Sequence, residues 1–507
     1  MNFPRSSGIL LHPTSLPGAY GIGELGPEAH AFADFLRDAG QRIWQVLPLG
    51  PTGYGDSPYQ CFSAFGGNPL LISVDVLAER GYLEQVDLAD APNFPENRVD
   101  FGAVIEWKLP LLCKAFEEFS RNAGASDRAE FDDFCRRHAS WLDDYALFMA
   151  LKEAHDLVIW TEWPPELALR EPAALERARS QCSDQVECNK FIQFEFERQW
   201  CDLKAHCTRN DIRMMGDLPI YVALDSADVW VDRQLFELNP DGRPRVVAGV
   251  PPDYFSATGQ LWGNPIYCWQ EHARTAYAWW IARFRRALEM LDMIRLDHFR
   301  GFEAYYEIPA GEVTAVNGAW VKGPGAGFFE ALKTAMGELP IIAENLGVIT
   351  PEVEALRKQF DFPGMAILQF AFGNDPQAPD FKPHNYTHHL VAYTGTHDND
   401  TVAGWWNSKA GAGSIRSAED VEKEMAYARR YLNTDGHDIN WAMIRTLMAS
   451  VAGTVLFPLQ DVLGVGSEAR MNLPGTSSGN WRWRFREESL TREISARLKD
   501  MASTYER

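Results

Sequence analysis

Cysteine is scarce in this sequence of 507 residues. The chain has eight cysteines and no C-x-x-C pair, which favours a reduced state for its thiols. Long apolar runs are also missing: no stretch is long enough to span a membrane, and the run 8–11 near the start is too short for the core of a signal peptide. We therefore expect a cytoplasmic protein.

Positive charge is in deficit as well. The chain has 48 Lys and Arg residues against 70 Asp and Glu residues, so its formal net charge is −22. Such a chain repels nucleic acid phosphates and anionic lipid surfaces, and we expect neither as a partner. Its glycine-rich loops are not followed by G-K-[ST], which excludes a phosphate-binding loop of that kind. A neutral substrate fits this charge best.

The rest of the composition is that of an ordinary folded protein. Hydrophobic residues make up 46% of the chain and charged residues 23%, and we find no repeat array or long linker. A length of 507 residues allows several average domains or one large barrel with insertions. The sequence gives no indication of the oligomeric state.

Short apolar runs that end in polar or Gly- and Pro-rich residues recur along the chain, as strands of a parallel barrel do. These runs are 7–11, 42–49, 212–222, 293–297, 339–344, 365–372, 390–396 and 450–456. Helical patterns lie between them, over 28–39, from residue 351 onward and over 490–501. The sequence therefore predicts an α/β fold, a (β/α)₈ TIM barrel forming a single catalytic unit over residues 1–507.

Two intervals between the expected strands are too long for one helix. We expect residues 50–211 to form an inserted, mainly helical subdomain, with clear helical patterns over 107–119 and 141–155. We expect residues 223–291 to form a second insertion. Its Gly- and Pro-rich part, 248–264, predicts a loop over the active face of the barrel.

Three carboxylates each follow an apolar run: Asp297, Glu344 and Asp398. A carboxylate at the end of a buried strand loses hydration, at a cost that partners or function must offset. Because the strand ends of a parallel barrel converge on one face, these three side chains are predicted to meet there. Two or more carboxylates around one sugar ring are typical of a retaining glycosidase-type site.

The surroundings of each acid suggest its role. Arg295 lies two residues before Asp297 on the same side of a strand, so it favours an ionised Asp297, which suits a nucleophile. Burial behind an apolar run raises the pKa expected for Glu344, which suits a general acid and base. His397 and Asp398 are placed to bind two adjacent ring hydroxyls.

Other interpretations of these residues are open at this point. Arg295 and Asp297 are equally well explained as a structural ion pair, and Glu344 as a helix-capping acid. The run 397–400 is as typical of an Asx-rich turn, or of a metal site, as of sugar binding. The glycosidase interpretation rests on all three segments falling at the ends of successive strands.

Aromatic residues point the same way, since the chain has 17 Trp and 16 Tyr. Flat sugar faces stack on such rings, while the polar edges of sugars bind acids and amides. Tyr54, Tyr59 and Trp262 are the rings that we expect against sugar. Ser57 and Asp253 lie in the same polar segments and complete the predicted contacts.

Several segments resemble the amylomaltases, 4-α-glucanotransferases of the α-amylase-like clan. They are residues 11–18, 54–59, 216–217, 250–255, 295–302, 343–347, 395–401 and 468–472, and they span nearly the whole chain. The resemblance implies Asp297 as nucleophile, Glu344 as acid and base, and Asp398 as the third carboxylate.

The resemblance also implies sugar contacts and substrates. Glucose units near the scissile bond would contact Tyr59, Asp217, Arg295, His397, Trp262 and Asn472, with Tyr54 at a second glucan groove. The substrates would be α-1,4-glucans such as starch and maltooligosaccharides, with glucose among the acceptors. No cofactor is implied, and no metal, because the residues after Asp217 lack the Asn-His pair of α-amylases.

The chain departs from the family pattern at two positions. Phe101 stands where the family resemblance leads us to expect a tyrosine, and a phenylalanine keeps the stacking but not the hydroxyl. Asn345 stands where we expect an aspartate, next to the predicted acid. Transfer is the predicted reaction; hydrolysis by the same carboxylates, or a catalytically silent glycan-binding scaffold on the same barrel, are the alternatives.

Overall fold

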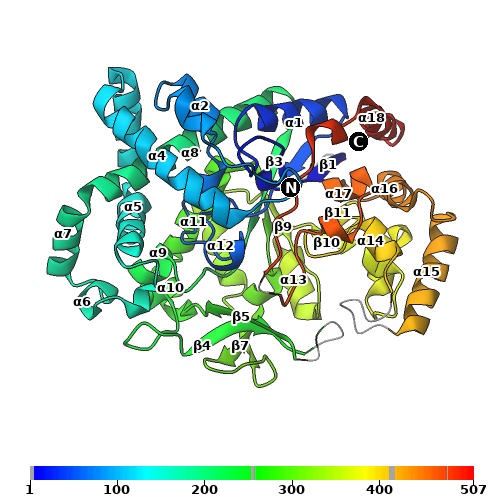
Figure 1. Cartoon of the computed structure of the whole chain (residues 1–507). Helices are drawn as coiled ribbons and strands as arrows, with labels where there is room; N and C mark the ends of the chain where they lie inside the picture. Colours follow the sequence, from blue (N-terminus) through cyan, green and yellow to red (C-terminus); the bar gives the residue numbers. More distant parts are fainter. Residues whose placement is uncertain (1–4, 253–255, 257, 410–416, 477) are drawn as a thin grey trace.

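The computed structural model describes residues 5–252, 256, 258–409, 417–476 and 478–507. Its centre is a sheet of eight parallel strands among these residues, in the order β10-β11-β12-β1-β2-β3-β6-β9. The strands are β1 (Ser6–Leu10), β2 (Ile43–Gln45), β3 (Arg213–Leu218), β6 (Met293–Leu296), β9 (Ile341–Ala343), β10 (Gly364–Ile367), β11 (Leu390–Tyr393) and β12 (Thr454–Pro458). Each falls within or overlaps one of the eight predicted runs, which confirms the predicted (β/α)₈ barrel (Figure 1).

The barrel closes where β9 meets β10. Ala343 N donates to Pro363 O at 2.9 Å, and Met365 N donates to the side-chain Oδ1 of Asn345 at 2.8 Å. Apolar side chains from the strands fill the interior, among them Met215 and Leu456, so the barrel is a packed core and not a pore.

Helices cover the outside of the barrel. The helices that lie between or after its strands in the chain include α1 (Pro27–Asp38), α8 (Ser183–Arg209), α11 (Ala278–Met290), α12 (Ala326–Met336), α13 (Pro351–Gln359), α16 (Ile439–Ala449) and α18 (Arg492–Thr504). The helical patterns predicted at 28–39, from 351 and at 490–501 correspond to α1, α13 and α18. In the part of the chain that the structure describes, no helix combines the length and apolarity needed to cross a membrane.

The interval between β2 and β3 is mainly helical. Its long helices are α4 (Phe101–Asn122), α5 (Ala125–Ala154) and α8, joined by the shorter α7 (Pro172–Gln181). Figure 1 shows them together on one side of the barrel. The predicted helix 107–119 lies within α4, which begins earlier, at Phe101, and the predicted helix 141–155 lies largely within α5, which begins much earlier, at Ala125.

The interval between β3 and β6 departs from the predicted loop. It contributes β4 (Val246–Val250) and β5 (Gln260–Pro265), which join β7 (Ala304–Pro309) and β8 (Ala319–Lys322) in an antiparallel sheet ordered β5-β4-β7-β8 within the described residues. These strands were not predicted, because β4 pairs with a segment that lies beyond β6 and because Gly- and Pro-rich flanks interrupt the alternation that marks a strand.

A buried ion pair ties the helical insertion to the barrel. Lys108 on α4 is fully buried, and its Nζ donates to Glu24 Oε1 at 2.5 Å and to Leu70 O at 2.7 Å. Glu24 follows β1, and its other oxygen accepts from Val74 N at 3.3 Å. Removing one member of such a pair leaves the other charge buried without compensation.

We therefore expect Lys108→Met to destabilise the protein by about 3–5 kcal/mol, measured as the change in urea-unfolding free energy. The matched control is Lys114→Met, on the same helix, where an exposed ammonium pairs with Asp87 and where we expect little change. Equal midpoints for the two variants would contradict a structural role for the buried pair.

Candidate active site

The ends of β3 and β6 bring two carboxylates to one guanidinium. Arg295 Nη1 donates to Asp217 Oδ2 at 2.6 Å and to Asp297 Oδ1 at 2.8 Å. Parallel pairing sets Asp217 beside Arg295 in register, and Asp297 follows at the end of β6. The Arg295 and Asp217 side chains are at most 5% exposed, whereas that of Asp297 is 26% exposed. Asp297 is thus the accessible carboxylate of this cluster.

Glu344 lies directly after β9 and is held by backbone donors on both sides. Leu346 N donates to its Oε1 and His298 N to its Oε2, each at 2.8 Å. His298 has a left-handed backbone (φ 49°), which turns the chain after Asp297 toward Glu344. Burial raises the pKa of Glu344 to about 7, although Arg295 and these two backbone donors lower it.

Asp398 follows β11 and lies within the segment that also carries His397. Asn472 Nδ2 donates to Asp398 Oδ1 at 2.7 Å, and His397 Nε2 lies 3.4 Å from the same oxygen. Arg470 Nη2 donates to Asp398 O at 2.6 Å, and Asn472 N donates to His397 O at 3.1 Å. The segment 468–472 therefore holds the loop after β11, which carries Asp398, in place.

Tyr59 joins these two clusters. Its hydroxyl donates to Asp217 Oδ2 at 2.9 Å, and its ring stacks on His397 with centroids 5.2 Å apart. Trp481, which was not predicted as a site residue, packs against both rings at 5.8 Å. Trp481 has a left-handed backbone (φ 65°), which is unusual for a bulky residue, but this signal exists only in the folded chain.

Two further predicted contacts have different surroundings. Trp262, on β5, lies edge-on to the His298 ring at 4.9 Å, so the antiparallel sheet reaches the β6 end of the barrel. Ser57 Oγ accepts from Tyr59 N at 3.2 Å and so stabilises the turn before Tyr59. Asp253 lies outside the described residues, as does the Tyr54 side chain, and the backbone of Tyr54 begins a short 3₁₀ helix (Tyr54–Asp56).

The structure does not support stacking of a glucan on Phe101. Such stacking is the contact that a phenylalanine would keep in place of a tyrosine. The Phe101 side chain is 2% exposed and packs in a cluster with Leu10, Phe94 and Trp481. Its ring is therefore part of the contact between α4 and the barrel and not a surface platform.

Asn345 does not turn its side chain to the predicted acid. Its Oδ1 accepts from Met365 N across the barrel seam, and its Nδ2 donates to Glu354 Oε1 at 2.7 Å. Arg357 Nη2 donates to the other oxygen of Glu354 at 2.7 Å. An amide at position 345 can satisfy both partners at once, because it offers one acceptor and one donor.

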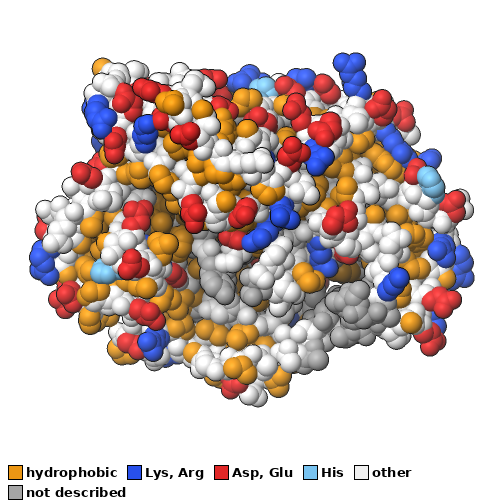
Figure 2. All heavy atoms as spheres, viewed as in Figure 1, with side chains coloured by type: hydrophobic (Ala, Val, Ile, Leu, Met, Phe, Trp, Pro, Cys, Tyr) orange, Lys and Arg blue, Asp and Glu red, His pale blue; other side chains and the backbone are white. Residues whose placement is uncertain are grey.

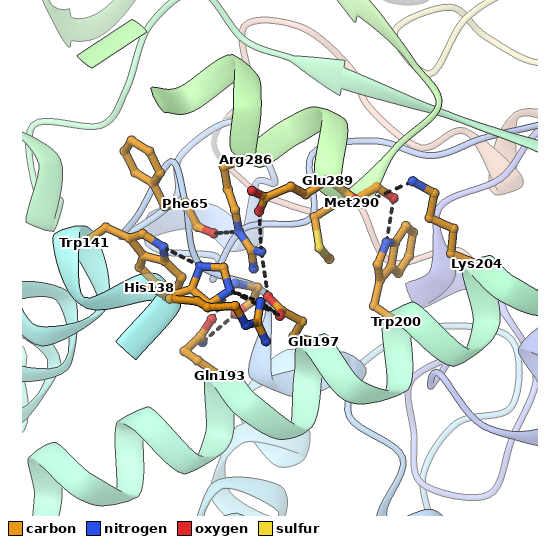
Figure 3. A network of polar contacts seen from close by, with 12 residues as sticks. Phe65, His138, Trp141, Gln193, Glu197, Trp200, Lys204, Arg286, Glu289 and Met290 are labelled. Atoms are coloured by element: carbon orange, nitrogen blue, oxygen red, sulfur yellow. Dashed lines mark hydrogen bonds and ion pairs between the residues drawn. The ribbon is translucent and has the colours of Figure 1, made fainter. Parts of the chain in front are cut away.

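The segment 57–67, which carries Tyr59, is held by side chains from two helices, α8 and α11. Arg286 Nε on α11 donates to Phe65 O at 3.1 Å, and Arg286 Nη1 donates to Glu197 Oε2 on α8 at 2.6 Å (Figure 3). Gln193, also on α8, accepts from Gly67 N at 2.6 Å and donates to Gly67 O at 2.9 Å. The helix α8 of the helical insertion and the barrel helix α11 therefore fix the far end of the segment that carries Tyr59.

The Glu197 carboxylate at the centre of this network is ionised. His138 Nε2 lies 3.2 Å from its Oε1. Although burial raises the pKa of Glu197, the hydrogen bond with His138 and the charge of Arg286 outweigh it and bring the pKa down to about 2. A cavity of about 100 Å³ extends from Tyr59 and Asp217 past Phe65 to Arg286.

Among the described residues, no three His, Cys, Asp or Glu side chains are grouped so that they could hold a metal ion. Figure 2 shows basic side chains interspersed with acidic ones on the face in view, without a continuous basic patch.

Comparison with known proteins decides the family. A family model described as 4-alpha-glucanotransferase matches residues 11–491. The chain belongs to the 4-alpha-glucanotransferase family. It is 52% identical to a 4-alpha-glucanotransferase of Thermus thermophilus, covering 100% of both chains, and 51% identical to one of Synechocystis, covering 99% of this chain and 98% of that protein.

Solved structures agree with this assignment to the 4-alpha-glucanotransferase family. The amylomaltase from Streptococcus agalactiae, in complex with acarbose, superposes with a TM-score of 0.94 at 40% identity, over 99% of each chain. The amylomaltase from Corynebacterium glutamicum, at 19% identity, shares the fold with a TM-score of 0.81, over 98% of this chain and 75% of that one. The predicted resemblance to the amylomaltases is confirmed.

The stability of the contact between β9 and β10 depends on the amide of Asn345. In Asn345→Asp two carboxylates would meet where the amide now donates to Glu354, and their repulsion raises the pKa of the pair above its unfolded value. Stability is then lost as pH rises: we expect a loss of about 1–2 kcal/mol near pH 8 that shrinks toward pH 5. Urea unfolding at several pH values measures this loss.

Asn345→Ala is the control for that series. It removes both hydrogen bonds without adding a charge. Because the Asn345 hydrogen bond helps to lower the pKa of Glu354, its loss matters for titration only in the acid range, and between pH 5 and pH 8 the loss of stability should not vary with pH. A pH-independent loss in Asn345→Asp would show that Glu354 and Asn345 are not coupled as the structure indicates.

Proposed function

We propose that Asp297, Glu344 and Asp398 carry out the 4-α-glucanotransferase reaction in two displacements on α-1,4-glucans. The observation that carries this assignment is the difference in environment between two carboxylates that sit after neighbouring strands. Asp297 is accessible and bound to Arg295, whereas Glu344 is 8% exposed and has a pKa raised to about 7. A nucleophile must be ionised and an acid must be protonated, and these surroundings meet both needs.

In the first displacement Asp297 attacks the anomeric carbon of the donor glucan. Arg295 stabilises the ionised carboxylate through one oxygen, Oδ1, so that the second oxygen can form the glycosyl bond. Glu344 gives its proton to the oxygen of the departing chain. The product is a covalent glucosyl-enzyme with inverted configuration.

In the second displacement the 4-hydroxyl of an acceptor glucan replaces water. Glu344, now ionised, removes the acceptor proton as the hydroxyl attacks the anomeric carbon, and Asp297 leaves. The second inversion restores the α-1,4 bond. The chain supplies both carboxylates, so the reaction needs no cofactor.

The remaining predicted residues bind sugar. Asp398 and His397 are held side by side by Asn472 and are suited to accept and donate hydrogen bonds to two adjacent ring hydroxyls. Tyr59 covers His397 and offers a ring edge beside them. Trp262 packs edge-on against the His298 ring and would line the acceptor side.

The substrates that we propose are starch chains, maltooligosaccharides and glucose. The acarbose complex of the Streptococcus agalactiae amylomaltase supports binding of an oligosaccharide-like ligand in this fold. The net charge of −22 argues for neutral substrates and against nucleic acid or membrane partners. We place the reaction in the cytoplasm, in keeping with eight unpaired cysteines.

Incubation with maltotriose alone separates transfer from hydrolysis. We expect glucose together with a ladder of longer maltooligosaccharides, while the total of reducing ends stays constant, because each transfer breaks one bond and makes another. Chromatography by length and a reducing-end assay measure the two quantities. Rising reducing ends without longer products would instead establish an α-glucan hydrolase.

Loss of the nucleophile tests the role of Asp297. We expect Asp297→Asn to lower kcat by about 10⁴-fold or more while maltooligosaccharide binding, measured by calorimetry, is retained. Glu344→Gln should cost about 10²–10⁴-fold, as removal of a general acid does. Asp211→Asn, an exposed residue ahead of β3, is the control and should leave turnover unchanged. Full activity in Asp297→Asn would refute the mechanism.

The pH profile tests the role of Glu344. The acid must start protonated, and burial sets its pKa at about 7. We therefore expect kcat/KM for maltotriose to fall by about tenfold per pH unit above that value, as the protonated fraction declines. A profile that stays flat through pH 9 would show that Glu344 is not the acid.

A further inference from the structure

Two cysteines of the helical insertion face each other across a helix pair. Phe116 and Phe119 on α4 pack against Phe191 on α8, with ring centroids 5.8 and 4.9 Å apart. Cys113 and Cys188 each lie three residues before members of this aromatic contact, and so on the same faces of their helices. The aromatic packing fixes the register of the helices and thereby holds the two sulfurs opposite each other.

The sulfur atoms are already close. Cys188 Sγ lies 2.9 Å from Cys113 Sγ, and a disulfide bond of about 2.05 Å would need the sulfurs to approach by less than 1 Å. Cys188 is 6% exposed, whereas Cys113 is exposed to solvent. We propose that Cys113 and Cys188 form a reversible disulfide when the protein meets hydrogen peroxide, at a site separate from the active site.

The order of reaction follows from the positions of the two thiols. Cys188 donates its S–H to Cys113, so the exposed sulfur is the one prepared to react as thiolate. Its hydrogen bond with Cys188 lowers the pKa of the Cys113 thiol, although burial and the carboxylates of Glu153 and Glu117 oppose this.

The bond changes balance with peroxide as the oxidant. Cys113 sulfur attacks one peroxide oxygen, the O–O bond breaks, and Cys113 sulfenic acid and one water form. Cys188 sulfur then attacks Cys113 sulfur, the S–O bond breaks, and the hydroxyl leaves as a second water with the Cys188 proton. Two thiols have lost two hydrogens in total, and the peroxide has been reduced to two waters.

The other cysteines are placed differently. All eight cysteines lie within the described residues, and none forms a disulfide in this structure. Burial raises the pKa of Cys61 and of Cys207 to about 12, which leaves little thiolate at neutral pH. Cys201, on α8, is exposed like Cys113, and it serves as the matched control.

The disulfide would stabilise the folded state of the helical insertion. Cys113 and Cys188 are 75 positions apart, so the bond would close a long loop that includes α5 and α7. Closing a long loop reduces the freedom of the unfolded chain. The helix α8 continues from Cys188 to Gln193 and Glu197, which hold the segment carrying Tyr59.

Peptide mapping tests the site directly. The full-length protein is treated with a small excess of hydrogen peroxide, free thiols are blocked with iodoacetamide, and the digest is analysed without reduction. We expect a peptide pair joined through Cys113 and Cys188 that separates on addition of dithiothreitol. Cys201→Ser should give the same pair, and Cys113→Ser should give none.

Thermal unfolding provides an independent readout. We expect oxidation to raise the unfolding midpoint by a few degrees in the unaltered protein and in Cys201→Ser, reversibly, and to have no such effect in Cys113→Ser or Cys188→Ala. Transfer on maltotriose should be retained in the oxidised protein, because neither sulfur belongs to the active site.

Two outcomes would overturn the proposal. One is a sulfinic or sulfonic acid at Cys113 with Cys188 still open to alkylation, which would show that the buried thiol does not reach it. The other is a disulfide that joins Cys113 to a different cysteine or to a second molecule. Neither outcome bears on the roles of Asp297 and Glu344, so the two proposals can fail separately.

Discussion

The arrangement of this protein depends on one buried cation, the guanidinium of Arg295. A charge in a barrel interior is costly unless carboxylates surround it, and here Asp217 and Asp297 bind the same nitrogen. Asp217 also accepts a hydrogen bond from the Tyr59 hydroxyl. Through Asp217, Arg295 is therefore linked to Tyr59 in the β2–β3 interval. Burial is what makes each of these interactions strong, and it also raises the pKa of the neighbouring Glu344.

The insertions belong to the same arrangement. Tyr59 lies on a segment whose far end is held by Arg286, Gln193 and the α8 carboxylate of Glu197, and none of these comes from a barrel strand. The antiparallel sheet reaches the barrel from another direction, through Trp262 and His298. The barrel thus supplies the carboxylates, while the insertions set the positions of the aromatic rings around them.

Much of the barrel could be read from the sequence because parallel strands buried on both faces leave short apolar runs, and a polar residue marks where each ends. The positions of Asp297 and Glu344, directly after β6 and β9, were predictable for the same reason. The strands β4, β5, β7 and β8 were not, since pairing between β4 and β7 joins segments on either side of β6. Trp481 was not identifiable either, because its packing on Tyr59 and His397 arises only in the folded chain. Phe101 shows a question that the sequence left open, and the structure buries its ring at the start of α4, against Leu10 and Trp481.

The sequence by itself determined the family and the order of the eight barrel strands, and it predicted roles for the three carboxylates, because these depend on local apolar patterns and on motifs of a few residues. Only the tertiary structure decided which groups form hydrogen bonds or ion pairs with one another. The contacts of Arg295 with Asp217, of Asn345 with Glu354, and of Cys113 with Cys188 join residues from separate elements. Their distances follow from how the strands close and how the helices pack, which no local pattern records.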